Sequence, residues 1–276
     1  MIVLVDKVKL AEKALWIRQQ VLEMCARAGE GRISSSLSWT EIAVALYYGR
    51  ILKFDPSNTA WGERDRFVLS KGWGVICLYP IFADLGFFPK EELDKYCTPG
   101  SLLGAYGDSV PGIEIVWASI GHGLGVAAGL ALAARMDKID CLTITVLGDG
   151  ECYEGSVWES AMFAGHHELN NLIAIVDRNR RCTIDYTENC LRLDPLDEKF
   201  MAFGWDVVCI DGHSYDEIFG AFKNIRSRRS RKPLMIIADT VKGKGISQLE
   251  QNPMAHVIIP AGAELEQARK DLKCPR

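Results

Sequence analysis

The 276-residue sequence lacks the features that mark several large classes of protein. No apolar run comes near the roughly 20 residues that span a bilayer, and the opening MIVLVDKVKLAEK is too short and charged too early for a secretory signal. The formal net charge is only −4, so nucleic acid is not expected as a main partner. No internal repeat and no linker is visible. We therefore expect a cytoplasmic protein, not bound to a membrane, with one domain over residues 1–276.

Cysteine is present, but not in the patterns that indicate a metal site. The nine cysteines are an odd number and contain no CxxC pair, so a zinc site or a disulfide framework is not expected. They are Cys25, Cys77, Cys97, Cys141, Cys152, Cys182, Cys190, Cys209 and Cys274. We expect them to be small core residues in a reducing compartment.

The hydrophobic pattern predicts an α/β fold. Continuous apolar runs at 141–147, 172–177, 205–210 and 234–239 are typical of buried strands, and 64–73 suggests a short strand that ends in a glycine loop. Helical patterns cover 7–29, 39–49, 121–136, 155–169 and 215–225, whereas 29–38 and 98–120 have the composition of loops. Continuous apolar strands that alternate with helices predict a parallel sheet covered by helices on both faces.

Polar residues follow two of these strands where ligands bind in parallel sheets. Asp149 follows the first of these runs within LGDGE (147–151), and Asn179 follows the second within VDRN (176–179), thirty positions later. Such spacing places the two strand ends side by side. Carboxylate, amide and carbonyl oxygens suit Mg²⁺ or Ca²⁺, Gly150 lets a phosphate approach the backbone, and a helix begins near Gly155. A divalent cation that holds a diphosphate is therefore expected here.

A GDG alone is a common turn, but GDGE followed by a helix, a buried strand and an Asn is specific. This pattern resembles the thiamine-diphosphate signature of the transketolase family. The resemblance extends through GRISSSLSWTEIAVALYYGRILKFDP (31–56), RDRFVLSKG (64–72), ASIGHGLGVAAGLALAARM (118–136), EGSVWESAMFAGHHELNNLIAIVDRN (154–179), DGH (211–213), TVKGKG (240–245) and NPMAH (252–256). It covers roughly residues 10–258 and implies the thiamine-diphosphate-binding fold of the diphosphate-binding (PP-type) module.

The resemblance also implies a partner chain. In this family the cofactor lies between two modules, and the second, pyrimidine-binding module supplies a glutamate that activates the cofactor. A chain of 276 residues has no room for that module. The resemblance therefore implies the N-terminal subunit of a split enzyme, paired with a separately encoded C-terminal transketolase subunit, as an α2β2 heterotetramer. Glu154 and Glu159 would lie in the region of the subunit interface.

Site residues follow from the resemblance by matching positions. Asp149 and Asn179 would bind the metal, Mg²⁺ or Ca²⁺, through side chains, and Arg181 would do so through its carbonyl oxygen. His256 would be the catalytic residue near the reacting carbon of the cofactor. The cofactor-binding residues would be Ala118, Ser119, Ile120, Gly150, Glu151, Asn179, His256 and Trp73.

Departures from the family pattern point to the substrate. Arg32, Trp73 and Ala105 stand where transketolases carry histidines, and Ala255 stands where tryptophan is usual. A hydroxyl-rich ketose would lose transition-state contacts in such a site. We expect transfer of a two-carbon ketol unit from a modified or non-standard ketose-like donor to an aldehyde. Two alternatives stay open: a 2-oxo acid-decarboxylating acyl or acyloin transferase, in which Arg32 meets a carboxylate, and a non-catalytic scaffold or regulatory subunit.

Overall fold

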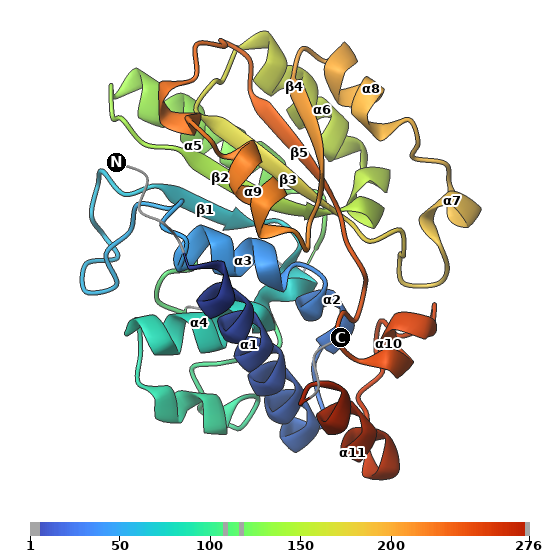
Figure 1. Cartoon of the computed structure of the whole chain (residues 1–276). Helices are drawn as coiled ribbons and strands as arrows, with labels where there is room; N and C mark the ends of the chain where they lie inside the picture. The colour runs from blue at the N-terminus through green and yellow to red at the C-terminus, as the bar shows by residue number, and fades with distance from the viewer. Residues whose placement is uncertain (1–5, 107–109, 116–118, 274–276) are drawn as a thin grey trace.

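The computed structural model of the chain describes residues 6–106, 110–115 and 119–273. Its centre is a parallel sheet with the strand order β1-β2-β3-β5-β4 (Figure 1). The strands are β1 (Arg66–Leu69), β2 (Thr143–Gly148), β3 (Leu172–Arg178), β4 (Asp206–Asp211) and β5 (Leu234–Asp239). All neighbouring pairs are parallel, so their carboxyl ends lie at the same edge of the sheet.

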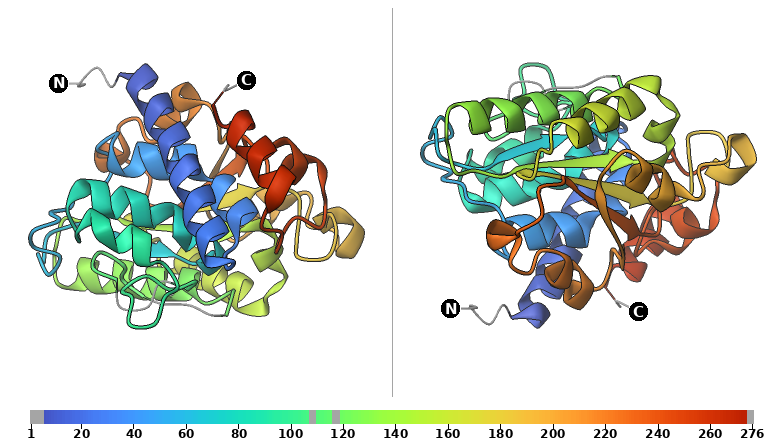
Figure 2. Two further views of the ribbon diagram at one scale, coloured as in Figure 1. Left: turned by 90° about the horizontal axis from the view of Figure 1, so that it is seen from below. Right: turned by 90° about the horizontal axis from the view of Figure 1, so that it is seen from above.

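Helices cover both faces of this sheet, and the predicted fold class is confirmed (Figure 2). The helices are α1 (Lys7–Ala28), α2 (Ile33–Leu37), α3 (Thr40–Tyr47), α4 (Leu78–Leu85), α5 (Gly123–Met136), α6 (Gly155–His166), α7 (Thr187–Cys190), α8 (Leu196–Ala202), α9 (Tyr215–Ala221), α10 (Ser247–Gln251) and α11 (Gly262–Asp271). Short 3-10 helices are η1 (Gly72–Cys77), η2 (Lys90–Lys95), η3 (Asp149–Tyr153) and η4 (Ile225–Ser227).

Each strand sends alternate side chains into two separate cores. In β2, Ile144 and Val146 pack with α1, α3 and α4 on one face, whereas Leu147 packs with α5 and α6 on the other. The faces of α5 and α6 are built from small residues, so the two helices approach closely: a Cβ atom at Gly125 would lie 2.9 Å from Ser160 Oγ. The second core also contains α8, whose Phe200 is fully buried.

Two expectations about local structure were wrong. Residues 29–38 are not all loop, because α2 forms within the serine run. Ser36 satisfies its hydroxyl locally by donating to the Arg32 carbonyl oxygen at 3.2 Å, which allows a polar turn of helix to be buried. The cysteines are also not all in the core: Cys25, Cys77, Cys141 and Cys152 are buried, but Cys97 and Cys182 are half-buried, Cys190 and Cys209 are exposed, and Cys274 lies outside the described residues.

The segment 98–120 agrees with its prediction wherever it is described, since it contains no helix or strand there. Within the ranges that the structure covers, no helix is both long and apolar enough to cross a membrane.

Candidate active site

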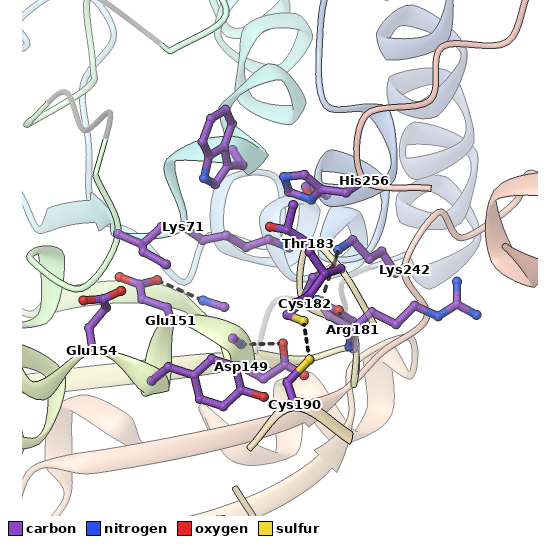
Figure 3. Close-up of a pocket in the computed structure, with 18 of the residues that line it drawn as sticks. Lys71, Asp149, Glu151, Glu154, Arg181, Cys182, Thr183, Cys190, Lys242 and His256 are labelled. Carbon is purple, nitrogen blue, oxygen red and sulfur yellow. Dashed lines mark hydrogen bonds between the residues drawn. The ribbon is translucent and has the colours of Figure 1, made fainter. Parts of the chain in front are cut away.

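A cavity of about 480 Å³ opens at the carboxyl ends of the strands. Its wall includes residues that follow β1, β2, β3 and β5, together with His256 from the chain beyond α10 (Figure 3). Of the predicted site residues, the following line it: Trp73, Ile120, Asp149, Gly150, Glu151, Asn179, Arg181 and His256. Ser119 is exposed and is not part of the wall, and Ala118 lies outside the described residues.

Asp149 lies at the end of β2, where the register of the sheet places it beside the end of β3. Gly148 pairs with Asp177 across the two strands, and the Asp149 carboxylate accepts hydrogen bonds from the Arg180 N–H at 2.5 Å and the Arg178 guanidinium at 3.3 Å. Burial and the nearby charge of Asp177 raise the pKa of Asp149 to about 6. A cation at this position would therefore stabilise the ionised carboxylate.

Asn179 and Arg181 supply neutral oxygen atoms beside Asp149. The Asn179 side chain donates to Asp177 at 3.0 Å and accepts from the Arg181 N–H at 3.2 Å. The Arg181 carbonyl oxygen accepts a hydrogen bond from the Lys242 ammonium at 3.2 Å, so this oxygen already faces a cationic group in the wall. The oxygen types match those that Mg²⁺ or Ca²⁺ selects, so the residues present fit such an ion.

Two buried lysines in the wall were missed by sequence reasoning. Lys242 donates to the Arg181 and Cys182 carbonyl oxygens at 3.2 and 3.0 Å, and burial together with the charge of Lys71 lowers its pKa to about 8. Lys71 follows β1 and forms an ion pair with Asp177. The signal was present in the sequence, since each lysine follows a predicted strand within a quoted family segment, SKG and TVKGKG.

Glu151 has a structural role in this cavity. Its carboxylate accepts hydrogen bonds from the Gly121 N–H at 2.8 Å and the Gly148 N–H at 3.1 Å, and from the Ser70 hydroxyl. Ser70 in turn accepts from the Gly123 N–H at 3.0 Å. These bonds hold the loop before α5 against the ends of β1 and β2, and they thereby place Ile120 in the wall.

His256 and Trp73 form the opposite part of the wall. Their rings lie 5.7 Å apart, edge to face, and His256 Nδ1 lies 3.4 Å from Ser35 Oγ. Burial and the charges of Lys242 and Arg32 lower the pKa of His256 to about 3, so its imidazole is neutral at physiological pH. Trp73 also carries the Arg32 guanidinium 5.0 Å above its ring and contacts Tyr106.

Within the described part of the chain, no group of three or more His, Cys, Asp or Glu side chains is arranged to hold a metal. A cation bound at Asp149 would thus need the amide, carbonyl and phosphate oxygens that Mg²⁺ accepts. The protein is thus an α/β protein with a polar cavity at the carboxyl ends of its parallel strands, where proteins of this class bind ligands. Two buried lysines and the carboxylates of Asp149 and Glu151 lie in its wall.

Comparison with known proteins identifies the family. The model of the transketolase thiamine diphosphate binding domain matches residues 11–274. The chain is 43% identical over 253 residues to a 6-deoxy-6-sulfo-D-fructose transketolase subunit of Clostridium sp. (strain MSTE9), covering 91% of each. It is 37% identical over 256 residues to an apulose-4-phosphate transketolase subunit of Phocaeicola vulgatus, covering 92% of this chain and 90% of that one.

Solved structures give the same result. The transketolase of Campylobacter jejuni superimposes with a TM-score of 0.89 at 29% identity, and the match covers 96% of this chain but 42% of that one. The chain belongs to the transketolase thiamine-diphosphate-binding domain family, as the sequence motifs predicted.

Proposed function

We propose that residues 1–276 form the diphosphate-binding subunit of a two-component transketolase that moves a two-carbon ketol unit from a modified ketose to an aldehyde. One observation carries this proposal: the chain matches transketolase subunits over nearly the whole length of both proteins, but spans only 42% of a solved transketolase. Family membership supports thiamine diphosphate as the cofactor, and the cofactor supplies the nucleophilic carbon that takes up the two-carbon unit.

Within this proposal, the strand ends bind the cofactor diphosphate. Asp149, Asn179 and the Arg181 carbonyl hold Mg²⁺ (or Ca²⁺), and Lys242 places a positive charge beside the same oxygens. Gly150 leaves room for a phosphate, since the position of a Cβ atom there faces only Cys182 within 4 Å. The predicted contacts of Ala118 and Ser119 with the cofactor also belong to this proposal.

His256 is the residue proposed to meet the substrate. Its neutral imidazole faces the cavity between Trp73 and Ser35, so it can accept or donate a hydrogen bond at a reacting oxygen without adding charge. A neutral imidazole held by burial is suited to positioning a substrate oxygen at physiological pH.

The partner proposed for this subunit is a separate chain with the pyrimidine-binding module, in an α2β2 assembly. Exposed apolar side chains lie in the cavity wall and on the helix that begins beside it. Ile184 and Leu191 line the cavity, and Met162 and Phe163 lie on α6. Large exposed apolar residues grouped in this way are typical of a surface that another chain covers. Glu154 and Glu159 are exposed on the same side of the fold, at the start of α6 and along it.

The donor proposed is a modified ketose with an anionic end, and a sulfonate is the group that we expect there. Arg32 is fixed by Glu30 at 3.0 Å and by the Gly31 carbonyl at 2.9 Å, and its guanidinium stacks on Trp73, which lines the cavity. A fixed guanidinium suits an anion with several oxygens. The two relatives named above act, by their names, on a sulfonated and a phosphorylated sugar.

The test is a coupled assay of this chain assembled with its pyrimidine-binding partner. We expect 6-deoxy-6-sulfo-D-fructose to exceed xylulose 5-phosphate at least tenfold in kcat/KM. Arg32→Gln should raise KM for the sulfonated donor about tenfold, whereas Arg269→Gln, on distant α11, should leave it unchanged. A kcat/KM of roughly 10⁴ M⁻¹s⁻¹ or more on xylulose 5-phosphate would show that the substrate is ordinary. Turnover of pyruvate instead would support the decarboxylating alternative, and a complex inactive on every donor would support the scaffold.

A further inference from the structure

Two cysteines face each other at the edge of the cavity. Cys182 and Cys190 both line it, and their sulfur atoms lie 3.4 Å apart (Figure 3). Cys182 is half-buried next to Arg181, and Cys190 is exposed at the end of α7. This contact joins two thiols that are separated by only seven residues of chain.

The backbone between the two cysteines is folded into a compact loop. Arg181 and Tyr186 form an isolated antiparallel bridge, and the Cys182 N–H donates to the Asp185 carbonyl oxygen at 3.0 Å. The Cys182 thiol also donates to that carbonyl oxygen at 3.1 Å, which fixes its sulfur on the side of Cys190. The fold therefore brings the two sulfurs together before any bond joins them.

We propose that Cys182 and Cys190 are an oxidation site that forms a reversible intramolecular disulfide and thereby weakens cofactor binding. An S–S bond is about 2.05 Å long, so the sulfurs must approach by roughly 1.4 Å. Cys190 can supply this movement, because it ends a four-residue helix and its side chain is exposed. By contrast, the described structure places no cysteine beside the exposed Cys209 of β4.

The oxidant proposed is a peroxide, and the reaction balances. One thiol, as its thiolate, attacks a peroxide oxygen; the O–O bond breaks, and a sulfenic acid and water are produced. The second sulfur then attacks the sulfenic sulfur, the S–O bond breaks, and a second water leaves with the thiol proton. Two thiols and one hydrogen peroxide thus give one disulfide and two waters. A dithiol reductant returns both thiols by exchange.

Oxidation would act on the cofactor through Cys182. Its carbonyl oxygen accepts from Lys242 at 3.0 Å, and its Cβ lies 3.3 Å from the position of a Cβ atom on Gly150. Both cysteines line the cavity, so a disulfide that draws Cys190 toward Cys182 and takes the Cys182 thiol from its hydrogen bond with Asp185 changes the wall opposite the proposed diphosphate position. This effect on affinity rests on the proposed function, whereas the disulfide itself does not.

The first readout is chemical. The reduced full chain is treated with hydrogen peroxide, alkylated and cleaved with trypsin, which should release residues 182–192 as one peptide with both cysteines. We expect this peptide to lose two hydrogens and to resist alkylation, and dithiothreitol to reverse the change. Cys190→Ser should abolish it, and the matched control Cys209→Ser should retain it. A peptide whose two thiols stay open to alkylation after peroxide treatment would overturn the proposal.

The second readout is the affinity for thiamine diphosphate with Mg²⁺, measured by calorimetry on the isolated chain and on the assembled complex. In the unsubstituted protein and in Cys209→Ser, we expect oxidation to raise the Kd for thiamine diphosphate at least tenfold. In Cys190→Ser, we expect the oxidised and reduced samples to have nearly the same Kd. An unchanged affinity despite a mapped disulfide would refute control of the cofactor. A reduced complex that binds no thiamine diphosphate would overturn the proposed function and its regulation, while the peptide result would still decide whether the disulfide forms.

Discussion

Asp177 offers the most direct test of how the cavity is held together. Its side chain is fully buried at the end of β3 and forms an ion pair with Lys71. It also accepts hydrogen bonds from Ser38 at 2.7 Å, from Asn179 at 3.0 Å and from Thr240. Burial opposes its ionisation, but the charge and hydrogen bond of Lys71 outweigh burial and lower the pKa of Asp177. Asp177→Asn keeps the shape of the side chain and removes the charge.

The expected loss is large because the Lys71 charge that remains is nearly buried. Lys71 has 7% of its side chain exposed, and its ammonium would keep as partners only the Ser38 hydroxyl at 2.8 Å and the neutral amide oxygen of the substituted side chain. Removing one member of a buried ion pair typically costs about 3–5 kcal/mol. We therefore expect Asp177→Asn to lower the free energy of unfolding by about 3 kcal/mol or more.

Urea unfolding of four chains measures this cost: the unsubstituted protein, Asp177→Asn, Lys71→Met and the double variant. Because the apolar methionine leaves no buried charge, the double variant should recover most of the stability lost by Asp177→Asn, with a coupling free energy of about 2 kcal/mol or more. The comparison requires equal m values across the four chains. An Asp177→Asn chain within 1 kcal/mol of the unsubstituted protein, or strictly additive losses in the double variant, would refute the reasoning.

Three further predictions concern the metal, the packing of α6 and acid stability. Asp149→Ala should abolish Mg²⁺-dependent binding of thiamine diphosphate in calorimetry of the complex, whereas Asp197→Ala, half-buried on α8 and not part of the cavity wall, should not change it. Gly165→Ala should lower the free energy of unfolding by about 3 kcal/mol, because its Cβ atom would lie 1.8 Å from the Phe203 carbonyl oxygen, whereas Gly129→Ala, with open space around it, should not destabilise the chain. Burial opposes the ionisation of Asp84, but hydrogen bonds from Lys13 and Lys90 outweigh burial and lower the pKa of Asp84 to about 2. Asp84→Asn should therefore lower the free energy of unfolding by about 1 kcal/mol above pH 4 after screening, and this difference should vanish as the pH falls through 2. A difference between the two chains that grows in acid would contradict this prediction.

The arrangement of the strand ends could be predicted because it depends on local patterns and one topological rule. Continuous apolar strands implied a parallel sheet, and parallel strands end at one edge, so Asp149 and Asn179 were expected to be neighbours. The pairing of Gly148 with Asp177 brings them to the same edge. The resemblance to transketolases added Trp73 and His256, which no spacing rule connects, and the structure places both in the cavity wall.

The hydrogen-bond partners of Lys242 and Glu151 could not be predicted, because they depend on where the loops after the strands cross the edge of the sheet. The sequence does not show that Lys242 returns to the Arg181 carbonyl oxygen, or that Glu151 accepts hydrogen bonds from the Gly121 and Gly148 N–H groups. The exposure of Cys190 escaped prediction for a similar reason. The residues around Cys190 have no apolar periodicity that would indicate whether its side chain is buried or exposed. The contact between Cys190 and Cys182 arises from the turn at Asp185.

The charges of the cavity explain why its ligand should be an anion. Lys71 is neutralised by Asp177, but within the described ranges no carboxylate lies at ion-pair distance from the Lys242 ammonium, whose hydrogen bonds go to carbonyl oxygens. A buried ammonium without a carboxylate is costly, and the lowered pKa of Lys242 reflects this cost. A bound diphosphate would supply negative charge to Lys242, and its divalent cation would add positive charge beside Asp149, whose partner Arg178 also pairs with Glu188 and Asp194. The two groups thus favour opposite charges, which supports the metal–diphosphate pair proposed as the ligand of this cavity.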